Sequence, residues 1–241
     1  MDIVEALGAE SGLTCVVGAG GKKTTLYSLA PRIERAVVTA TVRIPIFDSR
    51  MAAVHVTDDP VSAIESADGW PVGLVPEREG DRYLGYDPEV VDAIADSDGA
   101  DAVLVKADGA RTRWLKAPNE EEPRIPGSTD TVVPIASARV VGEPLSEERV
   151  HRPERVAAVT GLEQGEEIRA EDVATVLASE EGGMKGVPDD ASVVPLVNMV
   201  DEADLEAVGG EIAEAVLERA DVDRVVLARM IDDDPLVAVV E

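Results

Sequence analysis

The sequence predicts an α/β fold in which a mostly parallel sheet is covered by helices on both faces. Near-continuous apolar segments such as 102–105 and 225–228 indicate buried strands, and helical patterns separate many of them along the chain. This alternation is typical of parallel strands joined by helical crossovers. Because the chain of 241 residues has no internal repeat, low-complexity stretch or Gly/Ser linker, we expect residues 1–241 to form one domain.

Each predicted element follows from local residue types. Apolar and β-branched residues predict the strands, such as 36–42, which ends before Pro45, and Asp58-Asp59-Pro60 is typical of a helix start. Residues 110–126 are too rich in charge and proline for one regular element. The predicted strands are 13–17, 36–42, 54–56, 71–75, 102–109, 132–135, 156–159, 193–197, 225–228 and 237–240. The predicted helices are one that runs to about residue 35, then 60–67, 88–96, 170–179 and 203–219.

The chain carries 49 acidic and 22 basic residues, which gives a formal net charge of −27. The acidic residues are spread over the whole length, which is typical of a halophile protein that stays soluble in concentrated salt. Such a surface repels nucleic acid and anionic membranes, so neither is an expected partner. The single Cys15 permits no internal disulfide, and the sequence shows no secretory signal or bilayer-spanning apolar run. We therefore expect a cytoplasmic protein.

A glycine cluster connects the first predicted strand to the helix that follows, and it comprises Gly18, Ala19, Gly20, Gly21, Lys22, Lys23, Thr24 and Thr25. Glycines let the backbone turn tightly and approach phosphate oxygens, and a helix start presents free N–H groups and its positive dipole end to an anion. A lysine adds a full charge, and a threonine hydroxyl can reach Mg²⁺. The segment predicts a phosphate-binding loop, and with it a P-loop NTPase-like fold that binds Mg²⁺ with ATP or GTP.

The spacing leaves two registers open for the phosphate lysine. The standard pattern G-x-x-x-x-G-K-[ST] fits neither Lys22 nor Lys23, because its first glycine would fall on a valine. With Lys22, the preceding Gly21 is kept, but Lys23 occupies the place of the metal-binding hydroxyl. With Lys23, Thr24 supplies that hydroxyl. Electrostatics favours this second register, with Lys22 as an auxiliary phosphate contact.

Asp108 ends a predicted strand, and ligands of open parallel sheets bind beyond the carboxyl ends of the strands. A P-loop nucleotidase places there the acid that holds Mg²⁺, usually through water. We therefore expect Thr24 and Asp108 near the metal, and Asp108, Lys22 and Lys23 as the catalytic residues. The structural alternative is a plain Asp-Gly turn with Gly109.

Arg111, Arg113 and Lys116 form a local surplus of positive charge in an otherwise acidic chain. Guanidinium and ammonium groups are suited to anions, so we expect these three residues to bind the phosphate groups of a nucleotide or of a second substrate. The alternative is that they pair with the acidic residues 120–122.

The segment Asn198-Met199-Val200-Asp201 follows a late strand, like the N-K-x-D segment by which GTPases recognise guanine, with methionine in place of lysine. A carboxylate at Asp201 is suited to guanine N1–H and N2–H₂, so we expect Asn198 and Asp201 to contact the base. His55 and His151 have no Cys or His partner at zinc spacing, so we expect no metal site there.

Together, these segments resemble the YqeC family, a group of accessory proteins for selenium-dependent hydroxylases. The resemblance covers most of the chain. It is carried by 18–22 (G-A-G-G-K), 82–86 (R-Y-L-G-Y), 107–110 (A-D-G-A), 116–118 (K-A-P) with 122–126 (E-P-R-I-P), 150–154 (V-H-R-P-E), 182–188 (G-G-M-K-G-V-P) and 198–201 (N-M-V-D).

The resemblance implies a nucleotide-binding factor that helps to make or install a selenium ligand on the molybdopterin cofactor of molybdenum hydroxylases. Three residues depart from the expected family pattern, namely the extra Lys23, Lys106 in place of a glutamate and Met199 in place of a lysine. Residue chemistry and resemblance together predict an NTP hydrolase or phosphoryl-transfer enzyme that supports hydroxylase maturation. The alternative is a nucleotide-gated protein that docks on the molybdopterin cofactor or the hydroxylase without significant turnover.

Overall fold

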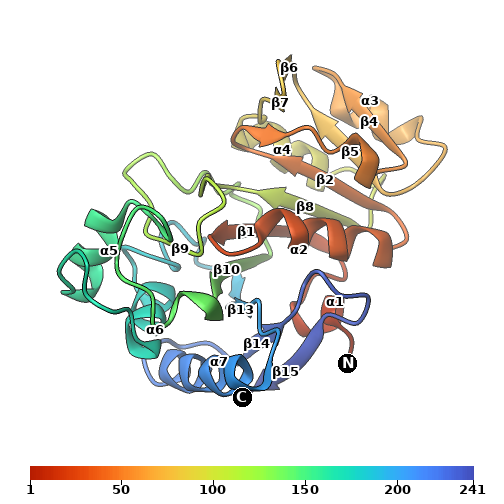
Figure 1. The fold of residues 1–241 in the computed structure, drawn as a ribbon. Helices are drawn as coiled ribbons and strands as arrows, with labels where there is room; N and C mark the ends of the chain where they lie inside the picture. Colours follow the sequence, from red (N-terminus) through yellow and green to blue (C-terminus); the bar gives the residue numbers. More distant parts are fainter.

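The computed structural model describes residues 1–241, and it shows a twisted central sheet with helices on both faces (Figure 1). The ten strands of this sheet are β1 (Gly12–Gly18), β2 (Ala36–Ala40), β4 (Ala53–Val56), β5 (Val72–Val75), β8 (Ala102–Lys106), β10 (Thr131–Ser137), β12 (Ser192–Val193), β13 (Leu196–Asn198), β14 (Val225–Ala228) and β15 (Leu236–Val240). Their order is β15-β14-β13-β10-β1-β8-β2-β5-β4, with β12 also paired to β10. Only β15 is antiparallel to its neighbour. The predicted α/β fold with a mostly parallel sheet is therefore confirmed.

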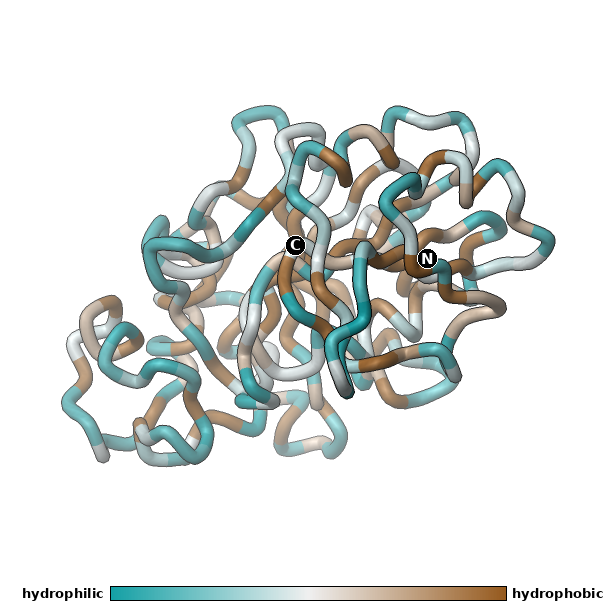
Figure 2. Tube along the Cα trace, turned by 90° about the horizontal axis from the view of Figure 1, so that it is seen from above, coloured by the Kyte–Doolittle hydropathy of each residue, from teal (hydrophilic) through white to brown (hydrophobic).

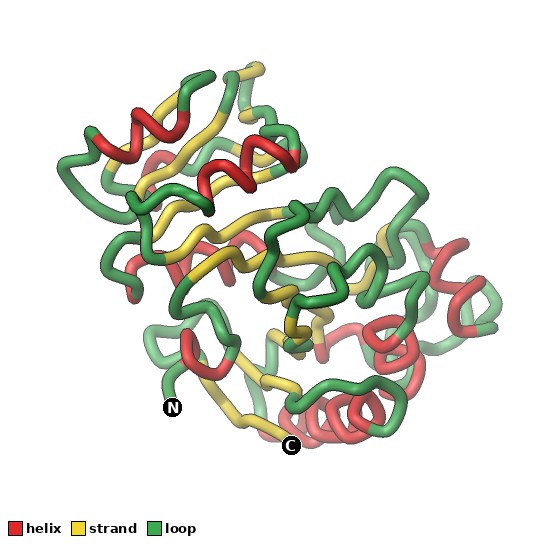
Figure 3. The backbone as a smooth tube through the Cα atoms, turned by 180° about the vertical axis from the view of Figure 1, so that it is seen from behind, coloured by secondary structure: helices red, strands yellow, loops and turns green.

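The α-helices are α1 (Ile3–Ala6), α2 (Lys22–Leu29), α3 (Pro60–Glu65), α4 (Pro88–Ala95), α5 (Pro153–Thr160), α6 (Ala170–Ala178) and α7 (Ala203–Leu217), and the short 3₁₀ helices are η1 (Ala30–Arg32), η2 (Asp48–Arg50) and η3 (Ala138–Val140). Helices α1 and α2 pack on one face of the sheet. The opposite face carries α3 and α4 over one half and α6 and α7 over the other half (Figure 3). No helix combines the length and the apolar character that a membrane crossing requires.

Alternate side chains of β1 enter the cores on the two faces of the sheet. Val16 packs with Leu26 of α2, whereas Cys15 and Val17 pack in the cluster that contains Ile94 of α4. Burial of each such side chain contributes about 1.5–3 kcal/mol. The hydrophobic residues follow the inner strands, and the hydrophilic residues lie mainly in the outer loops (Figure 2). The central strands are thus apolar almost throughout, as the sequence predicts for a sheet that is covered on both faces.

Two small sheets lie outside the main sheet. Strands β9 (Leu115–Lys116) and β11 (Val150–His151) form a parallel pair, and β3 (Ile44–Pro45), β7 (Arg82–Tyr83) and β6 (Arg78–Glu79) form an antiparallel sheet. These short strands connect segments that the sequence predicts as loops. Residues of β3, β7 and β11 line the cavity described below.

Four element predictions differ from the structure. The strand predicted at 102–109 ends at Lys106, so Asp108 and Gly109 lie in the loop after it. The strand predicted at 156–159 is wrong, because these residues form α5, where Pro153 at the helix start and the left-handed Gly161 at its end act as helix signals around a short apolar run. The first long helix stops at Leu29, and a 3₁₀ turn that contains Pro31 follows. The strand predicted at 193–197 is divided into β12 and β13, because Pro195 has no N–H group to donate.

Candidate anion-binding site

The glycine loop lies between β1 and α2, at the carboxyl end of the central strands. Gly18, Gly20 and Gly21 have φ angles of 84°, 93° and 135°, in the range that favours glycine. A side chain at Gly18 would collide with the Ile135 carbonyl, and one at Gly21 would collide with the Asn198 amide. The glycines therefore allow the loop to pack closely against β10 and β13.

Most backbone N–H groups of this loop are already used inside the protein. The hydrogen bonds run from Gly18 N to Asp108 Oδ2 (3.0 Å), from Ala19 N to Ile135 O (2.8 Å) and from Gly20 N to Arg113 O (2.9 Å). A loop that cradles phosphate would turn such groups toward the ligand instead. In this protein these N–H groups instead hold the loop against neighbouring segments.

The start of α2 supplies the backbone donors that remain free. Its first helical hydrogen bond runs from Thr25 N to the Gly21 carbonyl at 2.9 Å, so the preceding N–H groups of Lys22, Lys23 and Thr24 have no acceptor within the helix. The positive end of the helix dipole lies at the same place. An anion can therefore bind at the first turn of α2.

Lys22 and Lys116 hold Asp108 from two sides. Lys22 Nζ donates to the Gly18 carbonyl and forms a salt bridge with Asp108 Oδ1 at 2.8 Å. Lys116 Nζ contacts the other oxygen of Asp108 at 2.7 Å and Glu122 Oε2 at 2.7 Å, and Arg152 Nη1 contacts the same Glu122 oxygen at 2.7 Å. We call these side chains, Lys22, Asp108, Lys116, Glu122 and Arg152, the ion-pair chain.

The ion-pair chain keeps both of its carboxylates charged. Burial alone would raise the pKa of Asp108, but the ammonium groups of Lys22 and Lys116 outweigh burial and hold that pKa below its usual value. Burial likewise opposes ionisation of Glu122, but hydrogen bonds from Lys116 and Arg152 lower its pKa. Burial also lowers the pKa of Lys22, which Asp108 partly counteracts. Neither carboxylate is therefore free to act as a general base in this arrangement.

Lys106 is the last residue of β8 and is buried without an acidic partner. Its Nζ donates to the Arg43 carbonyl at 3.1 Å, and it forms no salt bridge. Burial, together with the positive charge of Lys22, lowers the pKa of Lys106 to about 7. Lys106 is thus a buried amine without a salt-bridge partner, and it is only partly protonated near pH 7.

A large cavity, with a volume of about 790 Å³, lies beside these groups. This volume is within the range that is typical of small-molecule sites. The basic residues that line it are Lys22, Lys23, Arg43, Arg82, Lys106, Arg111, Arg113 and Arg152. Glu122 is the one acidic residue in its wall. Eight of the 22 basic residues of a strongly acidic chain therefore converge on one cavity, which indicates an anionic ligand.

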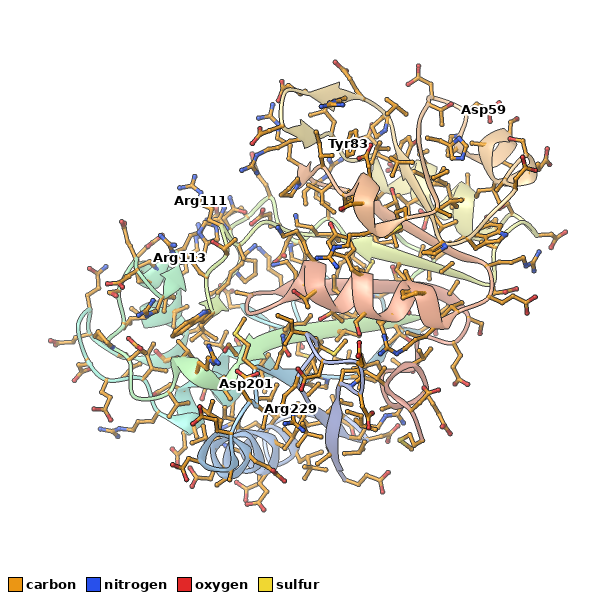
Figure 4. The ribbon with its side chains drawn as sticks, turned by 45° about the vertical axis from the view of Figure 1, so that its right-hand side comes forward. Asp59, Tyr83, Arg111, Arg113, Asp201 and Arg229 are labelled. Atoms are coloured by element: carbon orange, nitrogen blue, oxygen red, sulfur yellow. The ribbon has the colours of Figure 1, made fainter.

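The loop after β8 carries two of these arginines. Arg111 and Thr112 have φ angles of 47° and 61°, an unusual left-handed conformation for residues other than glycine. Arg111 and Arg113 lie near the edge of the molecule, between the part that contains Tyr83 and the part that contains α5 (Figure 4). Neither of them forms a salt bridge, so their charges remain available to a ligand.

The pairing of β9 with β11 positions another part of the cavity wall. His151 lies in register with Lys116, which brings His151 and Arg152 to the cavity. Burial, followed by the charges of Arg152 and Lys116, lowers the pKa of His151 to about 4, so this imidazole is neutral near pH 7. Neither of these two residues was predicted to belong to the site. The signal that could have identified them is the V-H-R-P segment, together with the scarcity of basic residues.

Many of the predicted site residues do come together. Those in the cavity wall are Gly20, Gly21, Lys22, Lys23, Thr24, Arg111 and Arg113. Gly18 and Ala19 lie beneath the loop in backbone hydrogen bonds, and the Thr25 hydroxyl donates to the Gly21 carbonyl at 3.2 Å. Lys116 lies inside the protein with no exposed side-chain surface. Its pairing with Glu122 matches the alternative in which the basic residues pair with the acidic residues 120–122. Arg111 and Arg113 have no such partner.

Asn198 and Asp201 do not line the cavity, although Met199 between them does. Asn198 is buried. Its amide Nδ2 donates to the Gly20 carbonyl at 2.8 Å, and its Oδ1 accepts from Met230 N at 3.0 Å. Asp201, which is labelled in Figure 4, pairs through its Oδ2 with Arg139 at 2.5 Å. In this structure Asn198 therefore supports the glycine loop from beneath.

Asn198→Ala should reduce the stability of the protein without changing any preference between ATP and GTP. The substitution leaves the Gly20 carbonyl and the Met230 N–H without partners, which costs about 1–3 kcal/mol for a buried polar group. Urea unfolding and nucleotide titration check the two parts of this prediction. Asp201→Asn is the matched control and should leave both quantities nearly unchanged. A selective loss of GTP binding in either variant would instead indicate base recognition.

The side chains around the loop do not form a ready-made Mg²⁺ site. No group of three or more His, Cys, Asp or Glu residues gathers to hold a metal ion. Thr24 lines the cavity, but both oxygens of Asp108 already contact ammonium groups, those of Lys22 and Lys116. Carboxylate oxygen is the ligand type that Mg²⁺ prefers. The donor set of Thr24 and Asp108 therefore does not fit a resident Mg²⁺ ion in this arrangement.

The fold and the site together define a class of protein, namely a parallel α/β protein with a large basic cavity beside a glycine-rich strand-to-helix loop. A family model described as YqeC protein matches residues 14–154, which include the glycine loop and nearly all of the cavity wall. The chain therefore belongs to the YqeC family. It is similar to the Escherichia coli (strain K12) protein named "Uncharacterized protein YqeC", with 29% identity over 245 residues that cover 98% of this chain and 94% of that protein.

Proposed function

We propose that this protein binds the phosphate groups of ATP or GTP in the basic cavity, at the start of α2. The observation that carries this proposal is the convergence of eight basic side chains on one cavity in a chain of net charge −27. Phosphate oxygens at the first turn of α2 would accept hydrogen bonds from its free N–H groups. Lys23, Arg111 and Arg113 have no acidic partners, so they can supply the counter-charges.

We further propose that nucleotide turnover by this protein supports the maturation of selenium-dependent molybdenum hydroxylases. The support for this step is the resemblance of the sequence segments to the family, because the cavity alone names no partner. Fixed positive charges around a transferred phosphoryl group stabilise its transition state, which suits an NTP hydrolase or a phosphoryl-transfer enzyme. Hydroxylase activity in a deletion strain, measured with and without added selenium, tests this step, and unchanged activity would contradict it.

The ion-pair chain favours a second candidate, a nucleotide-gated protein that docks on the molybdopterin cofactor or on the hydroxylase without significant turnover. Asp108 and Glu122 are both engaged by basic side chains, so no free carboxylate stands ready to orient a nucleophile. The simplest role for such a cavity is to bind a nucleotide without hydrolysing it.

Calorimetric titration with ATP and GTP in concentrated KCl tests nucleotide binding directly. We expect at least one nucleotide to bind with a single site per chain, and no binding of either would refute the proposal. The deletion experiment remains informative in that case, because it addresses the pathway and not the ligand.

The variant Lys106→Glu distinguishes the proposal of an enzyme from the proposal of a docking protein. If turnover requires an acid at this position to activate a nucleophile, the wild-type protein should bind nucleotide without releasing phosphate, and the variant should release phosphate. The measurement is the rate of phosphate release at nucleotide concentrations that titration shows to saturate each protein separately. Equal rates in the two proteins would show that the absence of an acid at position 106 is no reason to favour the docking protein.

A further inference from the structure

We infer that this site binds its polyphosphate without a divalent metal, and that the Lys106 ammonium supplies the positive charge that Mg²⁺ supplies in metal-dependent nucleotide sites. The inference rests on the proposed function, which it deepens by naming the form of the ligand. It follows from three features of the site, namely the charge of the cavity wall, the contacts of Asp108 and the surroundings of Lys106.

The cavity wall carries a surplus of positive charge that suits a polyphosphate chain. Eight Lys and Arg side chains line it. Three of them, Lys22, Arg43 and Arg152, form salt bridges with acidic side chains, and the other five form none. The one acidic residue in the wall, Glu122, is held by Lys116 and Arg152 at 2.7 Å each, so it adds no free negative charge that would attract a metal ion. A Mg²⁺-bound nucleotide carries less negative charge than the free nucleotide. The fixed cations should therefore attract the metal-free form more strongly.

Asp108, the acid nearest to the glycine loop, is not available as a metal ligand. Its Oδ1 forms a salt bridge with Lys22 at 2.8 Å, and its Oδ2 accepts hydrogen bonds from Lys116 at 2.7 Å and from Gly18 N at 3.0 Å. A metal ion that took one of these oxygens would displace an ammonium group that is itself buried. Leaving a buried charge without its partner is costly. The Asp108 carboxylate is thus already paired with two lysines and is not free to bind a metal ion.

Lys106 supplies the charge that the inference requires. It lies at the carboxyl end of β8, in register with Val16 of β1 and Ala40 of β2, so it is next to the central strand that carries the glycine loop. It is 6% exposed, and its Nζ contacts only the Arg43 carbonyl, at 3.1 Å. Burial without an acidic partner disfavours the protonated form of this amine unless another group supplies the counter-charge. An anion bound in the cavity would be that group.

Calorimetry on the full chain with ATP, and separately with inorganic triphosphate, tests the inference at a fixed KCl concentration. One titration contains EDTA and the other contains excess Mg²⁺. We expect the affinity in EDTA to equal or exceed the affinity in Mg²⁺ for both probes. Affinity that falls by about tenfold or more in EDTA would overturn the inference while the proposed function stands. Absence of binding under both conditions would overturn the proposed function, and the inference with it.

Substitution of Lys106 tests its role. Lys106→Gln should weaken binding in EDTA by roughly tenfold or more, and Mg²⁺ should restore part of that loss. Lys106→Arg keeps the charge and should retain most of the affinity in EDTA. Lys185→Gln, which removes a lysine outside the cavity, is the control and should behave as wild type. Unchanged affinity of Lys106→Gln in EDTA would overturn the role of this residue, and far-ultraviolet circular dichroism verifies that each variant is folded.

Discussion

Lys116→Met should lower the free energy of unfolding by about 3–5 kcal/mol, the largest stability effect expected for a single substitution in this site. The Lys116 side chain has no exposed surface and contacts Asp108, Glu122 and the Gly109 carbonyl. Its removal leaves two carboxylates in a buried region with fewer positive partners. Urea unfolding at constant KCl concentration measures the change.

Two further variants separate loss of charge from loss of packing. The double variant Lys116→Met with Glu122→Gln should recover part of the lost stability, because it also removes one of the unpaired charges. Lys185→Met is the matched control, since Lys185 contacts only the Asn119 carbonyl, at 2.5 Å, and it should change stability little. A loss of less than about 1 kcal/mol for Lys116→Met would show that the ion-pair chain is not a structural support.

Lys23→Ala should weaken nucleotide binding far more than Lys22→Ala does. Lys23 lines the cavity and has no acidic partner, so its whole charge is available to phosphate, whereas the charge of Lys22 is already paired with Asp108. Loss of a lysine–phosphate contact typically costs about 2–5 kcal/mol, or roughly 30- to 4,000-fold in affinity. Titration of both variants under the conditions that give the tightest wild-type binding measures the difference.

Lys22→Ala should mainly affect stability, because it leaves Asp108 with one ammonium partner and removes the contact with the Gly18 carbonyl. Unfolding measurements on both variants ensure that affinities are compared between folded proteins. The reverse order of affinities would show that Lys22 leaves Asp108 when ligand binds, and that the ungapped register with Lys22 as the phosphate lysine is correct.

Part of the site could be predicted because neighbouring parallel strands end at one edge of the sheet. The glycine loop follows β1 and Asp108 follows β8, and these strands are paired in the structure. Arg111 and Arg113 were predicted from their charge in an acidic chain, and both line the cavity. Arg82 gave no such signal. It reaches the cavity because β7 pairs with β3, and no local pattern indicated that two-residue pairing.

The sequence by itself determined the fold class and the position of the glycine loop, because strand and helix periodicity and glycine conformation are local properties of the chain. Only the tertiary structure decided how the charges are shared. Lys116 pairs with Asp108 and Glu122 inside the protein, Lys106 has no acid, and Asn198 holds the Gly20 carbonyl. These outcomes depend on burial and on contacts between segments that are far apart in the chain. Burial and distance determine whether a charge is neutralised within the protein or remains free for a ligand.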